Sequence, residues 1–207
     1  MMTTDRFLIL LKKKGPLTAK EIATEFNITG EAVRQQLNKL GQQDLVSSTS
    51  ITQGVGRPQQ YYSLLEKSNQ HFPDTHAELT VQLIETIQKV LGNNALDDII
   101  DARAKEIDLR YFERINQAES TIEGKLNCLV AIRNEEGYMA EWKKEENNYL
   151  LIENHCPICV AATVCQGFCR TEINTFQKVL GNEVEVKRID HIVLGARRCA
   201  YQITTVG

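Results

Sequence analysis

The chain has 207 residues and a formal net charge of −3, and its 42% hydrophobic and 25% charged residues are typical of a soluble globular protein. It has neither the run of roughly 20 apolar residues that a membrane-spanning helix needs nor a basic flank and apolar run after Met1, so we expect a cytoplasmic protein without a membrane partner. Residues 1–70 hold nine Lys and Arg against six Asp and Glu, while the remainder holds fifteen against twenty-one. The length favours two domains, and a basic part on an acidic body suits a DNA-binding head.

Three helices are predicted in the first part of the chain. Residues 4–14 combine an apolar face with a polar one, which predicts the first helix. Thr18, followed three residues later by Glu21, has the pattern of a capping box and predicts the start of the second. A short turn at 27–30 leads to a third helix from about Glu31 to Gln43.

The third helix has the pattern of a DNA-recognition helix. Val33, Leu37 and Leu40 repeat at i, i+4 and i+7, so this face is expected to pack on the first two helices. The polar residues at its start and on its outer face can bond base edges or phosphates in a major groove. We therefore predict DNA contacts from Thr29, Glu31, Arg34, Gln35, Asn38 and Lys39.

A β-hairpin is predicted after the third helix. Two β-prone runs, 45–53 and 59–64, flank the glycine-containing turn Gly54–Pro58. Arg57 would lie at the tip, where a cation reaches a minor groove or a phosphate. Residues 1–67 are therefore predicted to form a winged helix-turn-helix that binds double-stranded DNA; a module used only for protein contacts is the alternative.

Residues 68–119 are predicted to connect this head to a second domain. A polar linker, 68–74, precedes a helix over 75–91 with an apolar stripe, and a second amphipathic helix follows over about 95–115. These helices either form a dimer seam or pack on the C-terminal domain. We expect a homodimer, because two heads can bind two half-sites one helical turn apart.

Residues 120–207 are predicted to form a C-terminal α/β sensor domain, which makes the whole chain α+β. Its expected elements are a helix over 120–135, strands at 138–143 and 148–153, a helix over 170–180, and strands at 184–189 and 200–205. Cys128 lies on the first of these helices, where a small buried thiol is expected.

Five cysteines in this domain have the spacing of metal ligands. Cys156 and Cys159 form a Cys-x-x-Cys pair, and Cys165 and Cys169 are four residues apart, which on one helix would place both on one face. Cys199 would join them from a distant strand. Thiolates are soft ligands for iron–sulfur clusters or zinc, and a site that joins distant segments can transmit metal loss to the rest of the protein.

Two patterns around these cysteines carry a family resemblance. Twelve residues separate Cys156 from Cys169-Arg170-Thr171-Glu172, and Cys199-Ala200-Tyr201-Gln202-Ile203 follows near the C-terminus. In these patterns, and in its winged helix, the chain resembles SufR-type regulators, the winged-helix repressors of iron–sulfur cluster assembly operons. The resemblance implies a repressor whose Cys156, Cys169 and Cys199 ligate a 4Fe–4S or 2Fe–2S cluster.

Cys159 and Cys165 are additional to that pattern, so the fourth ligand and the metal stay open. Zinc is the alternative to an iron–sulfur cluster, and Cys165 is either a ligand or a buried core thiol. His155 and His191 are further candidate ligands.

Two other functions compete with a metal-sensing regulator. One is a thiol–disulfide oxidoreductase that uses Cys156 and Cys159, although no parallel-sheet pattern supports it. The other is a small-molecule-responsive regulator in which the cysteines hold a structural zinc ion. We expect no enzyme, because no phosphate-binding glycine loop and no Ser/His/Asp pattern is present.

Overall fold

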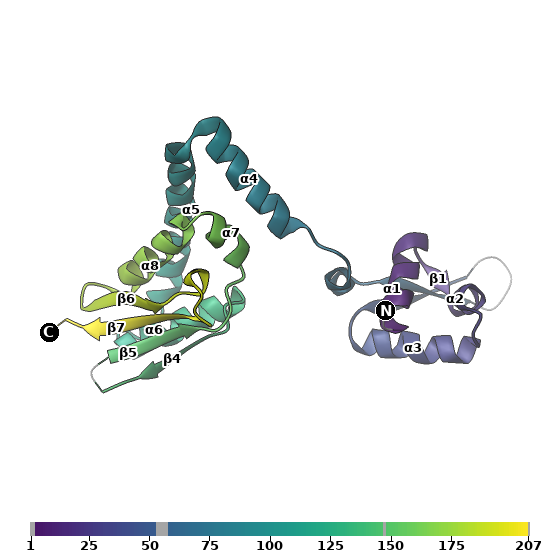
Figure 1. The fold of residues 1–207 in the computed structure, drawn as a ribbon. Coiled ribbons are helices and arrows are strands. Elements are labelled where there is room, and N and C mark those ends of the chain that lie inside the picture. The colour runs from purple at the N-terminus through teal and green to yellow at the C-terminus, as the bar shows by residue number, and fades with distance from the viewer. Residues whose placement is uncertain (1–2, 53–57, 147, 207) are drawn as a thin grey trace. The chain divides into compact units, whose positions relative to one another are not determined.

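A computed structural model describes residues 3–52, 58–146 and 148–206. The chain forms two compact units, Met1–Asp74 and Thr75–Gly207. In the described residues the first contains three α-helices, a 3-10 helix and a small sheet, and the second contains five α-helices, a 3-10 helix and a four-stranded sheet (Figure 1). Within the described residues, no helix is both long and apolar enough to cross a bilayer. The α+β fold with an N-terminal winged helix-turn-helix is therefore confirmed.

The N-terminal unit follows the predicted order. Its elements are α1 (Thr3–Lys14), β1 (Leu17–Thr18), α2 (Ala19–Phe26), α3 (Gly30–Gln42), β2 (Val46–Ile51), β3 (Gln59–Leu64) and the 3-10 helix η1 (Glu66–His71). The capping box at the start of α2 is formed, since the Thr18 hydroxyl accepts the N–H of Glu21 and the Glu21 carboxylate accepts the N–H of Thr18. This pair satisfies two backbone donors that the helix itself cannot.

A single apolar core holds the three helices and the wing together. Val33, Leu37 and Leu40 of α3 are buried against α1 and α2, as their spacing predicts. Strands β2 and β3 pair in antiparallel register from Val46↔Leu64 to Ile51↔Gln59. The two-residue strand β1 pairs with β3 and was not predicted, because two residues carry no periodicity. The predicted turn tip with Arg57 lies outside the described residues.

The segment 68–74, expected to be a polar linker, belongs to the N-terminal unit. Residues Glu66–His71 form η1, in which Ser68 is buried and donates its hydroxyl hydrogen to the carbonyl of Leu65. Phe72 packs against the core of the unit, with the ammonium group of Lys12 4.9 Å from its ring centre. The linker prediction was therefore wrong for these residues, because one aromatic ring anchors a polar segment.

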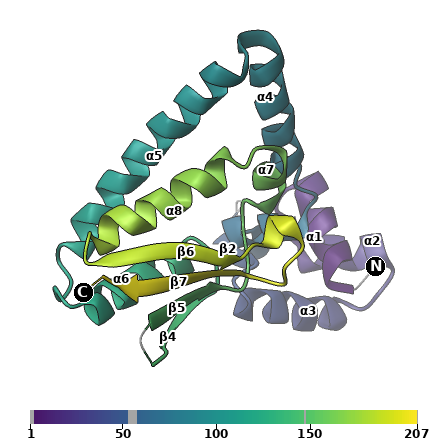
Figure 2. The ribbon, with the colours of Figure 1, turned by 60° about the vertical axis from the view of Figure 1, so that its left-hand side comes forward.

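The second unit is a helical layer on an antiparallel sheet. Its elements are α4 (His76–Leu91), α5 (Asn93–Ile115), α6 (Ile122–Glu135), β4 (Ala140–Lys144), β5 (Asn148–Glu153), α7 (Cys159–Val164), α8 (Gly167–Leu180), β6 (Val184–Asp190), the 3-10 helix η2 (Ile192–Leu194) and β7 (Cys199–Thr205). The strand order is β4-β5-β7-β6, and every neighbouring pair is antiparallel. In Figure 2, α5 and α8 run side by side along the sheet.

The core of this unit lies between the sheet and helices α5, α6 and α8. Alternate residues of β5 and β7, among them Leu151 and Tyr201, face this core. The rings of Phe176 and Tyr201 meet edge to face, with centroids 5.1 Å apart. At the start of α8, a Cβ on Gly167 would lie 3.0 Å from Ile100, so the close approach of α8 to α5 favours a residue without a side chain.

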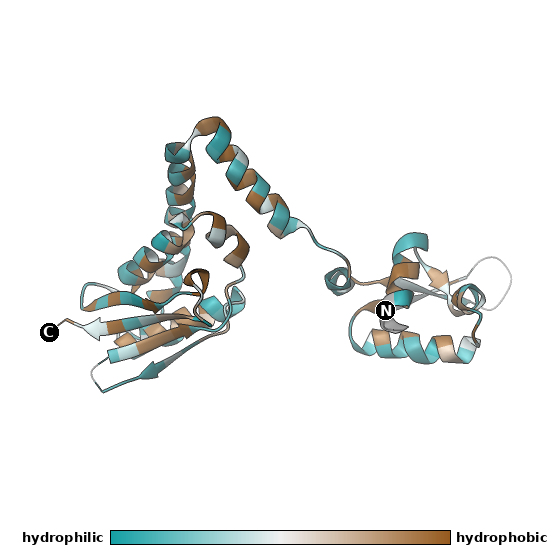
Figure 3. Cartoon of the chain, in the orientation of Figure 1, coloured by the Kyte–Doolittle hydropathy of each residue, from teal (hydrophilic) through white to brown (hydrophobic). Residues whose placement is uncertain are grey.

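Much of the apolar stripe predicted on helix α4 is exposed in the second unit. The stripe predicted to be its apolar contact surface includes Leu79, Leu83 and Val90, yet these side chains are 51%, 55% and 70% exposed. Ile84 is buried instead, packed with Leu96 and Ile100 of α5. Apolar residues therefore occur on two sides of α4, one packed within the unit and one open (Figure 3).

Candidate functional sites: a nucleic-acid interface and a thiol cluster

The outer face of α3 presents the side chains expected to contact DNA. We define the reading face as Thr29, Glu31, Arg34, Gln35, Asn38 and Lys39, all of which are exposed. The burial of Val33, Leu37 and Leu40 on the opposite side fixes this orientation. The hydroxyl of Thr29 accepts the N–H of Ala32 at 3.2 Å and so caps the helix. The structure therefore brings the six described candidates together on one surface.

Arg34 is held only weakly on this face. Its guanidinium lies 3.5 Å from a carboxylate oxygen of Glu31, one helical turn away, and both side chains are exposed. Exposed ion pairs of this kind contribute about 0–1 kcal/mol, so a phosphate can replace the carboxylate at little cost. The N-terminus of α3 also carries the positive end of the helix dipole, which favours an anionic partner.

The five candidate cysteines do not form one group. Cys165 ends α7 with an extended backbone (φ −138°, ψ 107°), whereas Cys169 lies inside α8. The expectation that both share one helical face is therefore wrong, because the helix breaks between them. Cys165 packs with the apolar cluster of Ile84 and Ile100.

The other four cysteines influence one another electrostatically, and we call Cys156, Cys159, Cys169 and Cys199 the thiol cluster. The pKa of Cys156 is raised to about 12, mainly by burial and also by the charges of Glu172, Cys159 and Cys199. Burial likewise raises the pKa of Cys169 to about 11, with contributions from Glu172, Cys199 and Cys159. These four groups thus lie close enough for the charge of one to be felt by the next.

Hydrogen-bond donors surround the thiol cluster. The backbone N–H of Ile158 bonds Cys156, and that of Ile192 bonds Cys199; both interactions lower the pKa of the thiol they reach. The Nε2 atom of His191 lies 3.3 Å from the Sγ atom of Cys169. Donors of this kind stabilise thiolate sulfurs in metal and iron–sulfur sites.

Arg188 supplies one further donor. It is positively charged, and that charge lowers the pKa of both Cys169 and Cys199. Among the buried side-chain nitrogen and oxygen atoms that the structure describes, its Nε is the one without a hydrogen-bond partner. A buried unpaired N–H calls for an acceptor, and a thiolate or an inorganic sulfide would be one.

Four cysteines with hydrogen-bond donors near their sulfurs are chemically suited to bind a metal as thiolates. In the described part of the chain, no three His, Cys, Asp or Glu side chains are already arranged tightly enough to hold a metal ion. His155 is exposed, and His191 contacts a cysteine. Metal binding at the thiol cluster would therefore require side-chain movement and the loss of thiol protons.

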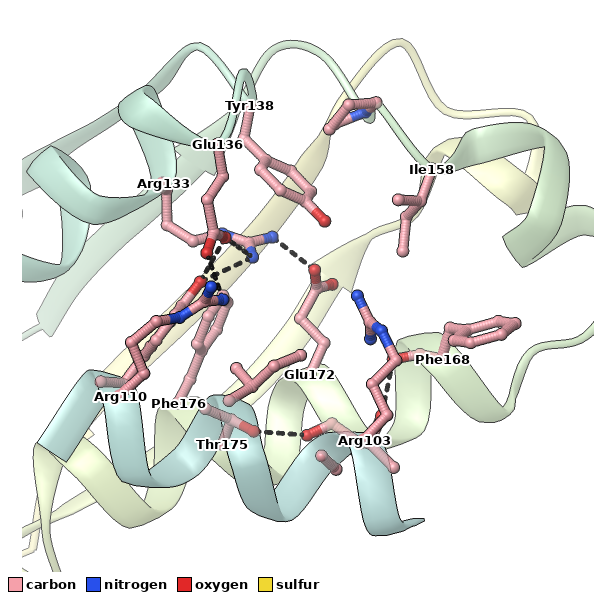
Figure 4. Close-up of a pocket in the computed structure, with 15 residues that line it drawn as sticks. Arg103, Arg110, Arg133, Glu136, Tyr138, Ile158, Phe168, Glu172, Thr175 and Phe176 are labelled. Atoms are coloured by element: carbon pink, nitrogen blue, oxygen red, sulfur yellow. Dashed lines mark hydrogen bonds and ion pairs between the residues drawn. The ribbon is translucent and has the colours of Figure 1, made fainter. Parts of the chain in front are cut away.

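A buried arginine pairs with Glu172, the carboxylate whose charge raises the pKa of Cys156 and Cys169, and the sequence did not predict its role. Arg133 of α6 is 4% exposed; its Nε donates to Glu153 at 2.5 Å and its Nη2 donates to Glu172. Its Nη1 donates to the hydroxyl of Tyr111 at 3.1 Å and to Glu136 at 3.3 Å (Figure 4). Although burial lowers the pKa of this guanidinium, the charges of its carboxylate partners hold it well above its ordinary value.

The environment of Cys156 argues against thiol–disulfide exchange. Reactive cysteines of that class have a lowered pKa and lie at a strand-to-helix junction of a parallel sheet. Here the pKa of Cys156 is raised, and the sheet is antiparallel.

Comparison with known proteins finds a family match within the N-terminal unit. Residues 7–48, from α1 into β2, match the family described as "Bacterial regulatory protein, arsR family". The match covers the helix-turn-helix and not the thiol cluster. The chain matches none of the curated proteins.

Solved structures show partial likenesses of fold. A cysteine-to-serine mutant of ZitR from Lactococcus lactis is 24% identical with a TM-score of 0.31, over 51% of this chain and 73% of that one. The adhesin competence repressor AdcR from Streptococcus pyogenes is 22% identical with a TM-score of 0.30, over 52% and 81%. The phenol-responsive sensory domain of the transcription activator PoxR, bound to phenol, is 12% identical with a TM-score of 0.45, over 83% and 89%.

The raised pKa values predict slow alkylation of two cluster thiols. At about pH 8, Cys156 and Cys169 are protonated in the folded, metal-free chain, while a thiol in an unfolded chain has a pKa of about 8.5. Iodoacetamide reacts with the thiolate, so both residues should react more than about 100-fold more slowly in the folded chain than in guanidinium, and Cys156 more slowly than Cys169. Peptide mapping by mass spectrometry after timed quenching measures this ratio. Equal alkylation rates in the folded and unfolded chain would contradict the assignment of Cys156 and Cys169 as buried thiols with raised pKa values. The ratio of the two rates should shrink as the pH rises toward the pKa of the folded chain.

Proposed function

We propose that this chain is a DNA-binding transcription regulator, a repressor of the SufR type, whose thiol cluster holds an iron–sulfur cluster or a zinc ion. The exposed reading face of α3 carries the proposal, because an outward polar helix in a winged helix-turn-helix is the geometry that enters a major groove. The match of residues 7–48 to a bacterial regulatory family supports it.

The proposed ligands are Cys156, Cys159, Cys169 and Cys199, with Cys159 as the fourth ligand rather than Cys165. A bound metal or cluster would supply bonds that tie thiolates from separate elements together. Cys159 begins α7, Cys169 lies in α8 and Cys199 begins β7. Iron–sulfur ligation comes from the resemblance, and zinc is the alternative for the same four thiols.

The chain offers a route from the thiols to α4. Ala161 and Val164 of α7 pack on Ile84 of α4, and α4 is the first element after Asp74, where the N-terminal unit ends. When Cys159 is held, the start of α7 is held with it, and α7 supports α4. Through α7, the packing of α4 can therefore depend on whether the cluster thiols hold a metal.

We also propose that a second copy of the chain covers the open face of α4. His76, Leu79, Leu83, Thr86 and Val90 follow one another at intervals of three and four residues, the spacing of a coiled-coil seam. Three of these residues are apolar and exposed. A homodimer joined here would present two reading faces to two half-sites.

The DNA-binding proposal predicts a local charge effect. Lys39→Gln and Arg34→Gln should each weaken binding to a duplex of random sequence and reduce the slope of log K against log salt by about 0.9 for each phosphate that is no longer neutralised. Fluorescence anisotropy across a salt titration measures both quantities. Lys187→Gln, the same change at an exposed position of β6, is the matched control and should leave both unchanged. Equal losses from Lys187→Gln and Lys39→Gln would contradict the assignment of the reading face.

The metal proposal predicts which cysteine is dispensable. In protein purified without oxygen, Cys159→Ser should lose most of its bound metal, whereas Cys165→Ser should retain it, because Cys165 packs with apolar residues. Iron, sulfide and zinc analysis per chain, with visible absorption, measures both variants. Zinc without sulfide would remove the iron–sulfur assignment, and metal loss confined to Cys165→Ser would overturn the choice of ligands.

The dimer proposal predicts a change of mass. Leu83→Lys should convert the dimer to a monomer in analytical ultracentrifugation, because a charge would replace an apolar seam residue. Leu109→Lys on α5, which is 66% exposed and lies off the seam, should leave the mass unchanged. A wild-type monomer at the concentrations used for DNA binding would refute this interface.

A further inference from the structure

A cavity lies beside the thiol cluster within the second unit. It has a volume of about 340 Å³, is partly open to solvent, and is bordered by α5, α8, the end of α6 and the segment before α7 (Figure 4). This volume is at the lower end of the range of small-molecule sites, roughly 300–1,000 Å³. The cavity is therefore large enough for one small organic molecule.

The cavity has polar and apolar walls in similar shares, and its apolar part is aromatic and aliphatic. Ile107 and Tyr111 of α5, Phe168 and Phe176 of α8, and Ile158 line it. Phe176 and Tyr111 are fully buried, so their positions are fixed by the core. Such walls favour a flat apolar body over a highly hydrated one.

Two polar groups in the cavity have no hydrogen-bond partner among the described residues. The guanidinium of Arg103 lies 5.7 Å from the ring centre of Phe168, and it forms no ion pair in the described part of the chain. The hydroxyl of Tyr138 is likewise unbonded, although the guanidinium of Arg133 stacks 3.3 Å from the centre of its ring. Figure 4 shows the Arg103 guanidinium and the Tyr138 hydroxyl directed toward the same space.

The remaining charges of the cavity are already paired. Arg110 donates to Glu136 at 2.9 Å. One carboxylate oxygen of Glu172 accepts from Arg133, and the other accepts from Arg188 and Tyr201 at 3.1 and 2.8 Å. Among the described residues that line the cavity, Arg103 is the arginine left without a carboxylate partner, and because it is exposed its charge is open both to the cavity and to solvent.

From this geometry we propose that the cavity binds a small aromatic monocarboxylate. The carboxylate accepts hydrogen bonds from the Arg103 guanidinium and the Tyr138 hydroxyl, and the aromatic body lies against Phe168, Ile107 and Ile158. A charged acceptor suits a guanidinium that has no internal partner. Burial raises the pKa of Tyr138 far above neutrality, so its hydroxyl stays protonated as a donor.

The cavity shares a wall with the thiol cluster. Pro157 and Ile158 line it, and they separate Cys156 from Cys159. Glu172 also lines it, and its charge raises the pKa of Cys156 and of Cys169. A molecule in the cavity would therefore contact the segment that carries two of the cluster thiols. The binding proposal itself does not depend on DNA binding or on metal.

Titration calorimetry of the full chain tests the proposal with benzoate and 2-naphthoate, and with benzamide and 2-naphthamide as uncharged counterparts. At least one carboxylate should bind with one molecule per chain, and its amide should bind about tenfold more weakly or worse, the factor expected for loss of a charge-assisted hydrogen bond. Absence of binding by both carboxylates, or equal binding of the amide, would overturn the proposal.

Variants locate the site. Arg103→Gln should weaken binding of the carboxylate about tenfold, and Tyr138→Phe should weaken it severalfold. Arg114→Gln, the same change on α5 at a residue that pairs with Glu135 and does not line the cavity, should bind as the wild type does. The fluorescence of Trp142, the single tryptophan, reports whether each variant retains the folded second unit. A folded Arg103→Gln chain that binds like Arg114→Gln would refute this site.

Discussion

The buried guanidinium of Arg133 is the interaction on which the second unit depends. Arg133 lies on α6. Its guanidinium donates hydrogen bonds to Glu153 at the end of β5, to Glu172 of α8, to Tyr111 of α5 and to Glu136. Glu172 extends the network to β6 and β7 through Arg188 and Tyr201. Charges removed from water destabilise a fold unless each is paired and hydrogen-bonded. This network therefore fixes the mutual positions of three helices and three strands more specifically than apolar packing alone.

The network lies between two features that could carry function. The side chains of Arg133 and Glu172 line the cavity. The charge of Glu172 also raises the pKa of Cys156 and of Cys169 in the thiol cluster. A change at either the thiols or the cavity thus acts on one shared carboxylate. In the N-terminal unit the comparable constraint is simpler: burial of Val33, Leu37 and Leu40 turns the reading face outward.

Local patterns predicted the longer helices and strands and the outward face of α3, because the interactions that form them join residues close in sequence; the short elements β1 and α7 were not predicted. The capping box of Thr18 and Glu21 spans three positions, and the α3 stripe spans two turns. Arg133 could not be predicted in this way, since its partners Glu153 and Glu172 are 20 and 39 residues away. The packing of Cys165 in an apolar cluster likewise depends on tertiary contacts with Ile84 and Ile100.

Urea unfolding of the Arg133→Met variant tests the central role of this network most directly. Trp142 on β4 is the single tryptophan, so its fluorescence follows the second unit alone. Removing the guanidinium leaves Glu153 buried without a cationic partner and leaves Glu172 with Arg188 as its remaining one, so the free energy of unfolding should fall by about 3–5 kcal/mol. Arg110→Met, which removes an exposed partner of Glu136, should cost less than about 1 kcal/mol. An Arg133→Met loss no larger than that of Arg110→Met would contradict the account.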